Sequence, residues 1–145
     1  MTHPSTRQIV KEFVKGSLGC QCPDEVFMDM ELLMEKEGLK ILVGKKLIVQ
    51  LLPLGKKASD ITTEKLLHIF SGGQKERDLK GYNRFRLVLV VKDDDEAKPR
   101  IEDLAQKVEK AFKKTKDSDE RMHLHIIDEG SVPEVLRVMA GIMVR

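Results

Sequence analysis

Residues 85–91 restrict the fold of this chain more than any other part of the sequence. The stretch opens with alternation at Arg84, Phe85 and Arg86 and then runs through five apolar residues without a break. A strand with apolar side chains on both faces is typical of the centre of a parallel sheet that is covered on both sides. The sequence therefore favours an α/β fold with a buried central strand.

Helical and strand patterns alternate along the rest of the chain. Apolar residues recur at helical spacing after a capping box at residues 5–8, and again over residues 59–70 and 100–114. Strand patterns cover residues 47–52 and 122–127. This alternation predicts βαβ crossovers. We expect an α/β domain of three layers: a mostly parallel sheet of about four strands, helices on both faces and a helical N-terminus.

Glycine and proline mark the expected ends of elements in the first third of the chain. Pro23 suits the first position of a second helix that ends at Gly38, although residues 31–35 also fit a strand. Two apolar runs surround Gly44, and a hairpin is one option for them. The choice between helix and sheet stays open here.

The second half of the chain has clearer boundaries. Gly72 and Gly73 are expected to end the helix that starts near residue 59, and a polar loop should follow over residues 74–83. A second capping box at residues 131–134 predicts a last helix.

The composition describes a single soluble domain that spans residues 1–145. There are 26 basic and 24 acidic residues, one Tyr and no Trp, so we expect no nucleic-acid-binding face with stacking aromatics. No apolar run is long enough to cross a membrane. Without a secretory leader, the two cysteines are expected to be reduced thiols in the cytoplasm.

Cys20 and Cys22 are the only cysteines, and Pro23 follows them directly. If Pro23 begins a helix, Cys22 is its N-cap, where free backbone amides and the helix dipole stabilise a thiolate. A disulfide across one intervening residue is strained, which is typical of a labile redox pair in which Cys22 attacks and Cys20 resolves. Asp24 and Glu25 oppose this role because negative charge disfavours a thiolate. Both thiols could instead pack in the core.

The segment that carries the cysteines resembles other proteins. Residues 18–27, with the pattern L-G-C-x-C-P-x-E-V-F, and residues 81–87 resemble a group of small uncharacterised bacterial and archaeal proteins. The two stretches cover about an eighth of the chain. The resemblance implies no known activity.

A pair of histidines offers further ligands. His123 and His125 alternate on an expected strand, so both should point to one face. With Cys20 and Cys22 they would complete a Cys2His2 set suited to tetrahedral zinc, provided that the two pairs meet in space. The alternative is a half-exposed strand face beside Arg121.

Acidic residues follow the central strand. Asp93, Asp94 and Asp95 lie where ligands bind in open α/β sheets, and carboxylates there can hold magnesium and, through it, a phosphate. Residues 128–131 follow the next strand, so both acidic loops share one edge if the strands are parallel neighbours. The alternative is a solvated loop, since no glycine-rich phosphate motif follows any strand.

These patterns give a leading hypothesis and two alternatives. The leading one is a small cytoplasmic domain that uses Cys20 and Cys22 to bind a metal or to carry out thiol redox chemistry. The first alternative is a non-catalytic, homodimeric interaction module, for which the seven methionines supply adaptable contacts. The second is a phosphate- or nucleotide-binding domain at the acidic strand ends. Arg84 and Arg86 are expected to be edge charges, with anion binding as their alternative role.

Overall fold

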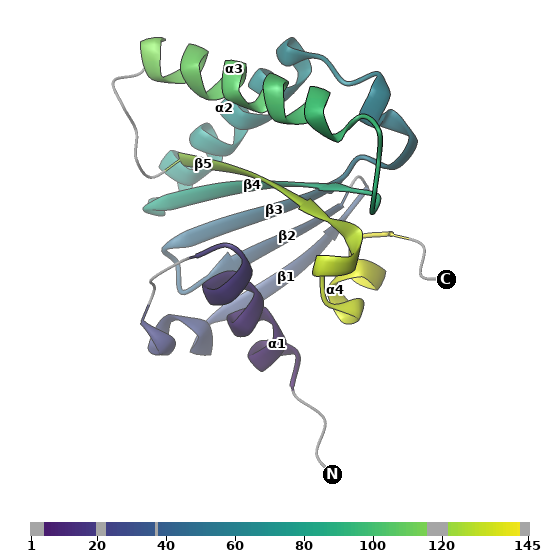
Figure 1. The fold of residues 1–145 in the computed structure, drawn as a ribbon. Helices are drawn as coiled ribbons and strands as arrows, with labels where there is room; N and C mark the ends of the chain where they lie inside the picture. Colours follow the sequence, from purple (N-terminus) through teal and green to yellow (C-terminus); the bar gives the residue numbers. More distant parts are fainter. Residues whose placement is uncertain (1–4, 20–22, 37, 116–121, 143–145) are drawn as a thin grey trace.

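The described part of the chain forms a five-stranded sheet with helices on both faces (Figure 1). The computed structural model describes residues 5–19, 23–36, 38–115 and 122–142. The strands lie in chain order: β1 (Met30–Glu35), β2 (Gly38–Val43), β3 (Leu47–Pro53), β4 (Arg84–Val91) and β5 (Met122–Asp128). β2 is antiparallel to both of its neighbours, whereas β3, β4 and β5 are parallel to one another. The predicted α/β class is confirmed, but the predicted mostly parallel sheet of about four strands is wrong.

Short connections explain the antiparallel part of the sheet. Two residues separate β1 from β2, and residues 44–46 separate β2 from β3. A parallel pairing needs a crossover of about a dozen residues or more. At the second turn, Gly44 and Lys45 have φ of 59° and 56°, and the amide of Lys46 donates to the carbonyl of Val43. Positive φ at both central residues suits a tight turn, and β2 pairs antiparallel with β3, so the hairpin option is correct.

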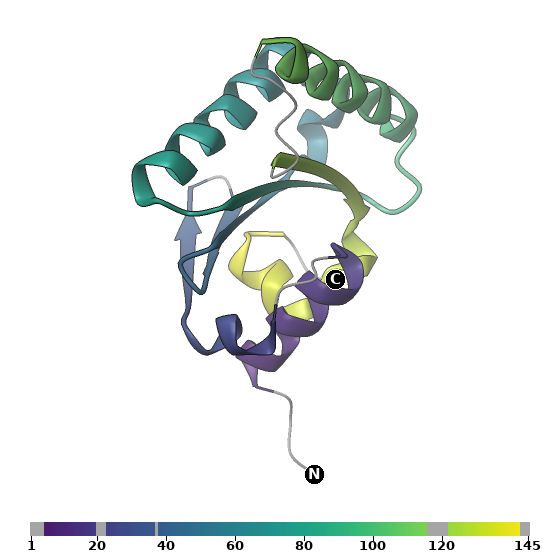
Figure 2. The ribbon, with the colours of Figure 1, turned by 90° about the vertical axis from the view of Figure 1, so that its left-hand side faces the viewer.

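The helices form two layers, one on each face of the sheet (Figure 2). α2 (Thr63–Lys80) and α3 (Lys98–Thr115) cover one face and serve as the crossovers between the parallel strands. The other face is covered by α1 (Thr6–Glu12), its π-helical continuation η1 (Phe13–Ser17) and α4 (Glu134–Met139). The predicted three layers and helical N-terminus are therefore present.

Pro23 does not begin the α-helix that the sequence favours. It is the N-cap of a five-residue 3₁₀ helix, η2 (Asp24–Met28), after which the chain enters β1. Met30 and Leu32 pack against the core, whereas Met34 is 71 % exposed. Every residue of β1 pairs with β2. Pairing with β2 therefore decides against the helix that the spacing of the same apolar residues suggests.

The paired glycines do not end α2. A Cβ on Gly73 would lie 2.2 Å from the ring of Phe85, whereas one on Gly72 would meet nothing within 4 Å. Gly73 thus lets α2 lie directly on β4. The helix continues through most of the expected polar loop and ends at Gly81, whose φ of 71° suits a left-handed C-cap.

The last helix starts without the predicted capping box. Ser131 belongs to a short 3₁₀ helix, η4 (Glu129–Ser131), and Pro133 is the N-cap of α4 with no side-chain hydrogen bond. The helix itself is present, as predicted.

Two hydrophobic cores lie on opposite sides of the sheet, and β4 contributes to both. Phe85, Leu87 and Leu89 pack under α2 and α3, while Val88 and Val90 pack under α1 and α4. The prediction of a central strand that is apolar on both faces is therefore confirmed. Within the described ranges, no helix is both long and apolar enough to cross a membrane.

Candidate functional site

Cys20 and Cys22, the expected redox or metal pair, lie outside the described residues. The described chain ends at Gly19 before them and resumes at Pro23 after them. The prediction that Cys22 caps an α-helix is wrong, because Pro23 is the cap residue and η2 is a 3₁₀ helix of five residues. A helix dipole therefore gives little support to a thiolate here.

Arg86 on β4 is hydrogen-bonded to Leu18, which lies two residues before Cys20 in the sequence. It is only 6 % exposed. Its Nη1 donates to the carbonyl of Leu18 at 2.5 Å and to Nε2 of His125 at 3.0 Å. Leu18 is the C-cap of η1, so the guanidinium lies at the negative end of a helix dipole. Arg86 thereby ties the end of the first helix to the sheet.

The charge of Arg86 lacks a carboxylate partner in the described part of the chain. Its buried Nε also has no hydrogen-bond partner there. Burial lowers the pKa of the Arg86 guanidinium, and the charge of Arg84 lowers it further. A buried cation without a counter-charge is costly. Arg86 is therefore not the edge charge that the sequence suggests, whereas Arg84 is exposed.

His125 faces Arg86 as a neutral acceptor. Because arginine can only donate, Nε2 of His125 accepts and the ring proton lies on Nδ1. Burial, followed by the charges of Arg86 and His123, lowers the pKa of His125 from 6.5 to about 4. The ring centroids of His123 and His125 are 6.3 Å apart, in keeping with the prediction that the two side chains share one face of β5.

The structure does not test the zinc prediction. It needs Cys20 and Cys22, and in the ranges that the structure describes no three His, Cys, Asp or Glu side chains form a group that could hold a metal. His125 and His123 alone supply at most two ligands, and Nε2 of His125 already accepts a hydrogen bond from Arg86.

Two lysines balance the acid that follows the cysteines. Nζ of Lys11 lies 3.1 Å from Oδ2 of Asp24, and Lys15 donates a hydrogen bond to Oδ1. The hydrogen bonds from Lys15 and then Lys11 lower the pKa of Asp24. The negative charge that opposes a thiolate in the sequence is therefore paired with two cations.

The acidic loops after β4 and β5 meet at one edge of the sheet, because these strands are parallel neighbours. Oδ1 of Asp93 accepts a hydrogen bond from the amide of Gly130 at 2.9 Å. A Cβ on Gly130 would lie 2.7 Å from Oδ2 of Asp93, so glycine permits this contact. Asp93 thus ties the two loops together.

The other acids at this edge also have structural contacts. Oδ1 of Asp95 accepts from the amide of Ala97 at 2.8 Å, and Asp128 pairs with Lys98 at 3.0 Å. Asp94 is exposed, with a φ of 58°. A magnesium or phosphate role for Asp93, Asp94 and Asp95 stays a prediction.

A groove of about 860 Å³ lies at the same edge, and we call it the carboxyl-edge groove. It is lined by residues that follow β3, β4 and β5, by the start of α2 and by the end of α4. Its charged lining residues are Glu35, Lys36, Lys65, Lys92, Asp93, Glu129 and Arg137. Sequence reasoning placed a ligand at this edge but missed the cations, because they come from four separate segments.

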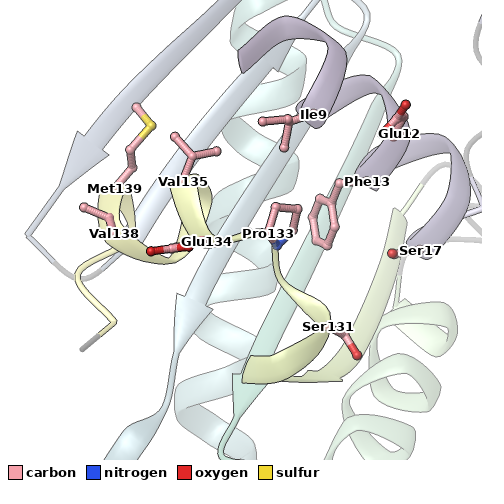
Figure 3. Close-up of a pocket in the computed structure, with 10 residues that line it drawn as sticks. All are labelled: Ile9, Glu12, Phe13, Ser17, Ser131, Pro133, Glu134, Val135, Val138 and Met139. Atoms are coloured by element: carbon pink, nitrogen blue, oxygen red, sulfur yellow. The ribbon is translucent and has the colours of Figure 1, made fainter. Parts of the chain in front are cut away.

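A second groove, of about 760 Å³, lies between α1–η1 and α4, and we call it the α1–α4 groove (Figure 3). Ile9 and Phe13 line one side and Pro133 and Val135 the other, so its surface is mainly apolar. Val138 at its margin is 61 % exposed. This groove is shallow hydrophobic surface without a chemical centre.

Comparisons of the chain with protein-family models, curated proteins and solved structures find no match. The resemblance of the cysteine segment to small bacterial and archaeal proteins therefore stays a prediction.

Proposed function

We propose that the protein carries out thiol–disulfide exchange through Cys20 and Cys22, with Arg86 as the cation that favours their thiolate form. One observation carries the proposal: a buried guanidinium donates to the Leu18 carbonyl and has no carboxylate partner among the described residues. A neighbouring cation lowers the pKa of a thiol and so increases the nucleophilic thiolate fraction.

Cys20 and Cys22 follow Leu18, whose carbonyl Arg86 binds, by two and four residues in the sequence. A thiolate within reach would supply the negative charge that Arg86 lacks. The pairing of Asp24 with two lysines also weakens the main electrostatic argument against a thiolate.

Arg86 favours the redox role over the metal role. A zinc ion held by Cys20, Cys22, His123 and His125 would need a ring nitrogen of each histidine as a ligand. The Nε2 lone pair of His125 is already used by Arg86. A thiolate gains stability from the same cation.

The exchange takes place in two balanced steps. The Cys22 thiolate attacks one sulfur of a substrate disulfide, which forms a mixed disulfide and releases the first substrate thiolate. The Cys20 thiolate then attacks the sulfur of Cys22 and releases the second substrate thiolate. The protein ends with a Cys20–Cys22 disulfide, and the substrate gains the two electrons that the cysteines lose.

Mass spectrometry after mixing with glutathione disulfide tests this proposal. The wild-type protein should lose two hydrogens and release two glutathione molecules for each chain. Cys20→Ser should stop at the mixed disulfide, because Cys22 attacks but nothing resolves it. Cys22→Ser is the matched control and should react much more slowly.

Two outcomes would contradict the proposal. In the first, Cys20→Ser and Cys22→Ser react equally slowly, at the rate of an ordinary exposed thiol. In the second, the protein purified without added metal holds one zinc per chain, and Cys22→Ser loses it. The second outcome would establish the metal role instead.

The α1–α4 groove favours a second candidate function, a homodimeric interaction module. Exposed apolar side chains such as Val138, beside an apolar groove, favour contact with another protein surface. Sedimentation at increasing concentration should then show a dimer, and Val138→Lys should remain monomeric. Gln106→Lys on α3, on the opposite side of the sheet, is the matched control. A monomeric wild-type protein at every concentration would exclude this candidate.

A further inference from the structure

The carboxyl-edge groove lies at the point where the connections that follow two neighbouring strands leave the sheet toward opposite faces. β4 and β5 are parallel neighbours, yet the chain leaves β4 toward α3 on one face and leaves β5 toward α4 on the other. Lys92 and Asp93 follow the first strand, Glu129 and Gly130 follow the second, and all four line the groove. Ligands of open α/β sheets bind in crevices of this kind beyond the carboxyl ends of the strands.

The acids of the groove are mostly engaged, whereas its cations are not. Glu35 pairs with Lys40 at 3.4 Å, and Asp93 accepts from the amide of Gly130. Glu129 is left as the one lining acid whose side chain has no such partner in the described chain. The four lining cations, Lys36, Lys65, Lys92 and Arg137, have no acidic partner among the residues that the structure describes. The groove therefore presents a surplus of free positive charge.

Arg137 is the lining cation with a forked guanidinium. Its Nε is buried and has no hydrogen-bond partner in the described part of the molecule. Its guanidinium fork is suited to the oxygens of a phosphate.

The walls of the groove indicate the rest of the ligand. Ile61 and Ile69 come from the α2 side, and Met139 and Ile142 come from the α4 end. A volume of about 860 Å³ lies within the range of small-molecule sites. Apolar walls beside a few convergent polar groups are typical of such sites.

We infer that the carboxyl-edge groove binds a small organic phosphate. Its phosphate group pairs with Lys65, Lys92 and Arg137, and its apolar body packs between α2 and α4. A phosphate suits the site better than a carboxylate because it carries more charge and offers more acceptor oxygens to several cations. The cations bind it directly, so no magnesium ion is needed at Asp93. This inference is independent of the thiol chemistry.

Amide NMR titration with phenyl phosphate tests the inference, because that probe combines a phosphate with an apolar body. Saturable shifts are expected at the amides of Lys65, Lys92, Gly130 and Arg137, and they should be the same with magnesium and with a chelator. Inorganic phosphate should shift the same amides with weaker affinity, and phenylacetate, a carboxylate, should bind more weakly than phenyl phosphate.

Variants separate this site from general attraction to positive charge. Lys65→Ala combined with Lys92→Ala should weaken phenyl phosphate binding about tenfold, and both positions are exposed, so the fold should be retained. Lys107→Ala is the control, because Lys107 lies on α3 outside the groove and pairs with Asp103. An equal loss in the control, shifts that require magnesium, or no saturable shift at the four amides would overturn the inference. Cys20→Ser with Cys22→Ser should bind normally.

Discussion

Positive charges lie near both ends of β4, but they are buried at one end and exposed to solvent at the other. At its amino end, Arg86 is buried, and its partners are a backbone carbonyl and a neutral imidazole. Beyond its carboxyl end, Lys92 and its neighbours Lys65 and Arg137 line an open groove. Both regions have cations without acidic partners among the described residues, but only the groove is accessible to a ligand from solution.

This difference shows that burial decides what a cation can act on. A buried guanidinium affects groups that the protein itself brings to it, such as the Leu18 carbonyl, the His125 ring and, as we propose, a cysteine thiolate. Exposed lysines in a groove are screened by solvent and contribute little to stability. They remain available for an anion that enters the groove.

The largest expected effect comes from the contact between α2 and Phe85 of β4. Gly73→Ala should lower the free energy of unfolding by about 3 kcal/mol, because the new Cβ would lie 2.2 Å from the Phe85 ring. α2 would have to shift, and its first turns line the groove. Gly72→Ala is the matched control and should raise stability by about 1 kcal/mol, since alanine favours the helix and nothing lies nearby.

Urea unfolding of both glycine variants measures this difference, and phenyl phosphate titration shows whether the groove changes with it. Similar stabilities for the two variants would contradict the close approach of α2 to β4. The thiol pKa should be unaffected by Gly72→Ala.

A smaller effect concerns the amino end of β4, where His125 makes the stability of the protein sensitive to acid. Above pH 6.5, His125 is neutral in the folded and the unfolded chain. As the pH falls, the unfolded chain takes up a proton near pH 6.5, whereas the folded chain does so only near pH 4. Stability contributed by the neutral ring is therefore lost between these values, by about 2 kcal/mol at about pH 5.

His125→Gln should remove this part of the acid sensitivity, because glutamine can still accept from Arg86 but does not titrate. Urea unfolding at neutral and acidic pH compares it with His68→Gln, a control at an exposed histidine of α2. If His125→Gln loses as much stability on acidification as the wild-type protein, then His125 does not account for the acid sensitivity, and its assignment as a neutral ring in the folded protein is wrong.

Local sequence patterns were enough to predict elements in which the spacing of apolar residues matches the face that the element buries. The continuous apolar run of β4 and the helical spacing in α3 both match the structure, because in each element the apolar residues are the ones that face a core. The meeting of Asp93 with Gly130 followed from the parallel neighbours β4 and β5. The strand pattern after Pro23 was ambiguous, and only pairing with β2 decides it.

The features that sequence could not supply depend on distant contacts. Two adjacent glycines normally break a helix, but Gly73 is tolerated because Phe85 fills the space beside it. One charged residue inside an apolar strand was the available signal for Arg86. Its partner Leu18 is 68 positions away in the sequence, so neither the burial of Arg86 nor its place beside the cysteine segment was visible.

The pH titration of the cysteine thiols, followed by thiolate ultraviolet absorbance, is the most direct test of the proposed role of Arg86. In the wild-type protein, at least one thiol should ionise at a lower pH than a free cysteine. Arg86→Met should raise that pKa by about one unit, which corresponds to about 1.4 kcal/mol. Arg84→Met, an exposed position on the same strand, should change it much less. Unchanged thiol ionisation in Arg86→Met, with the fold retained, would show that Arg86 only ties η1 to the sheet.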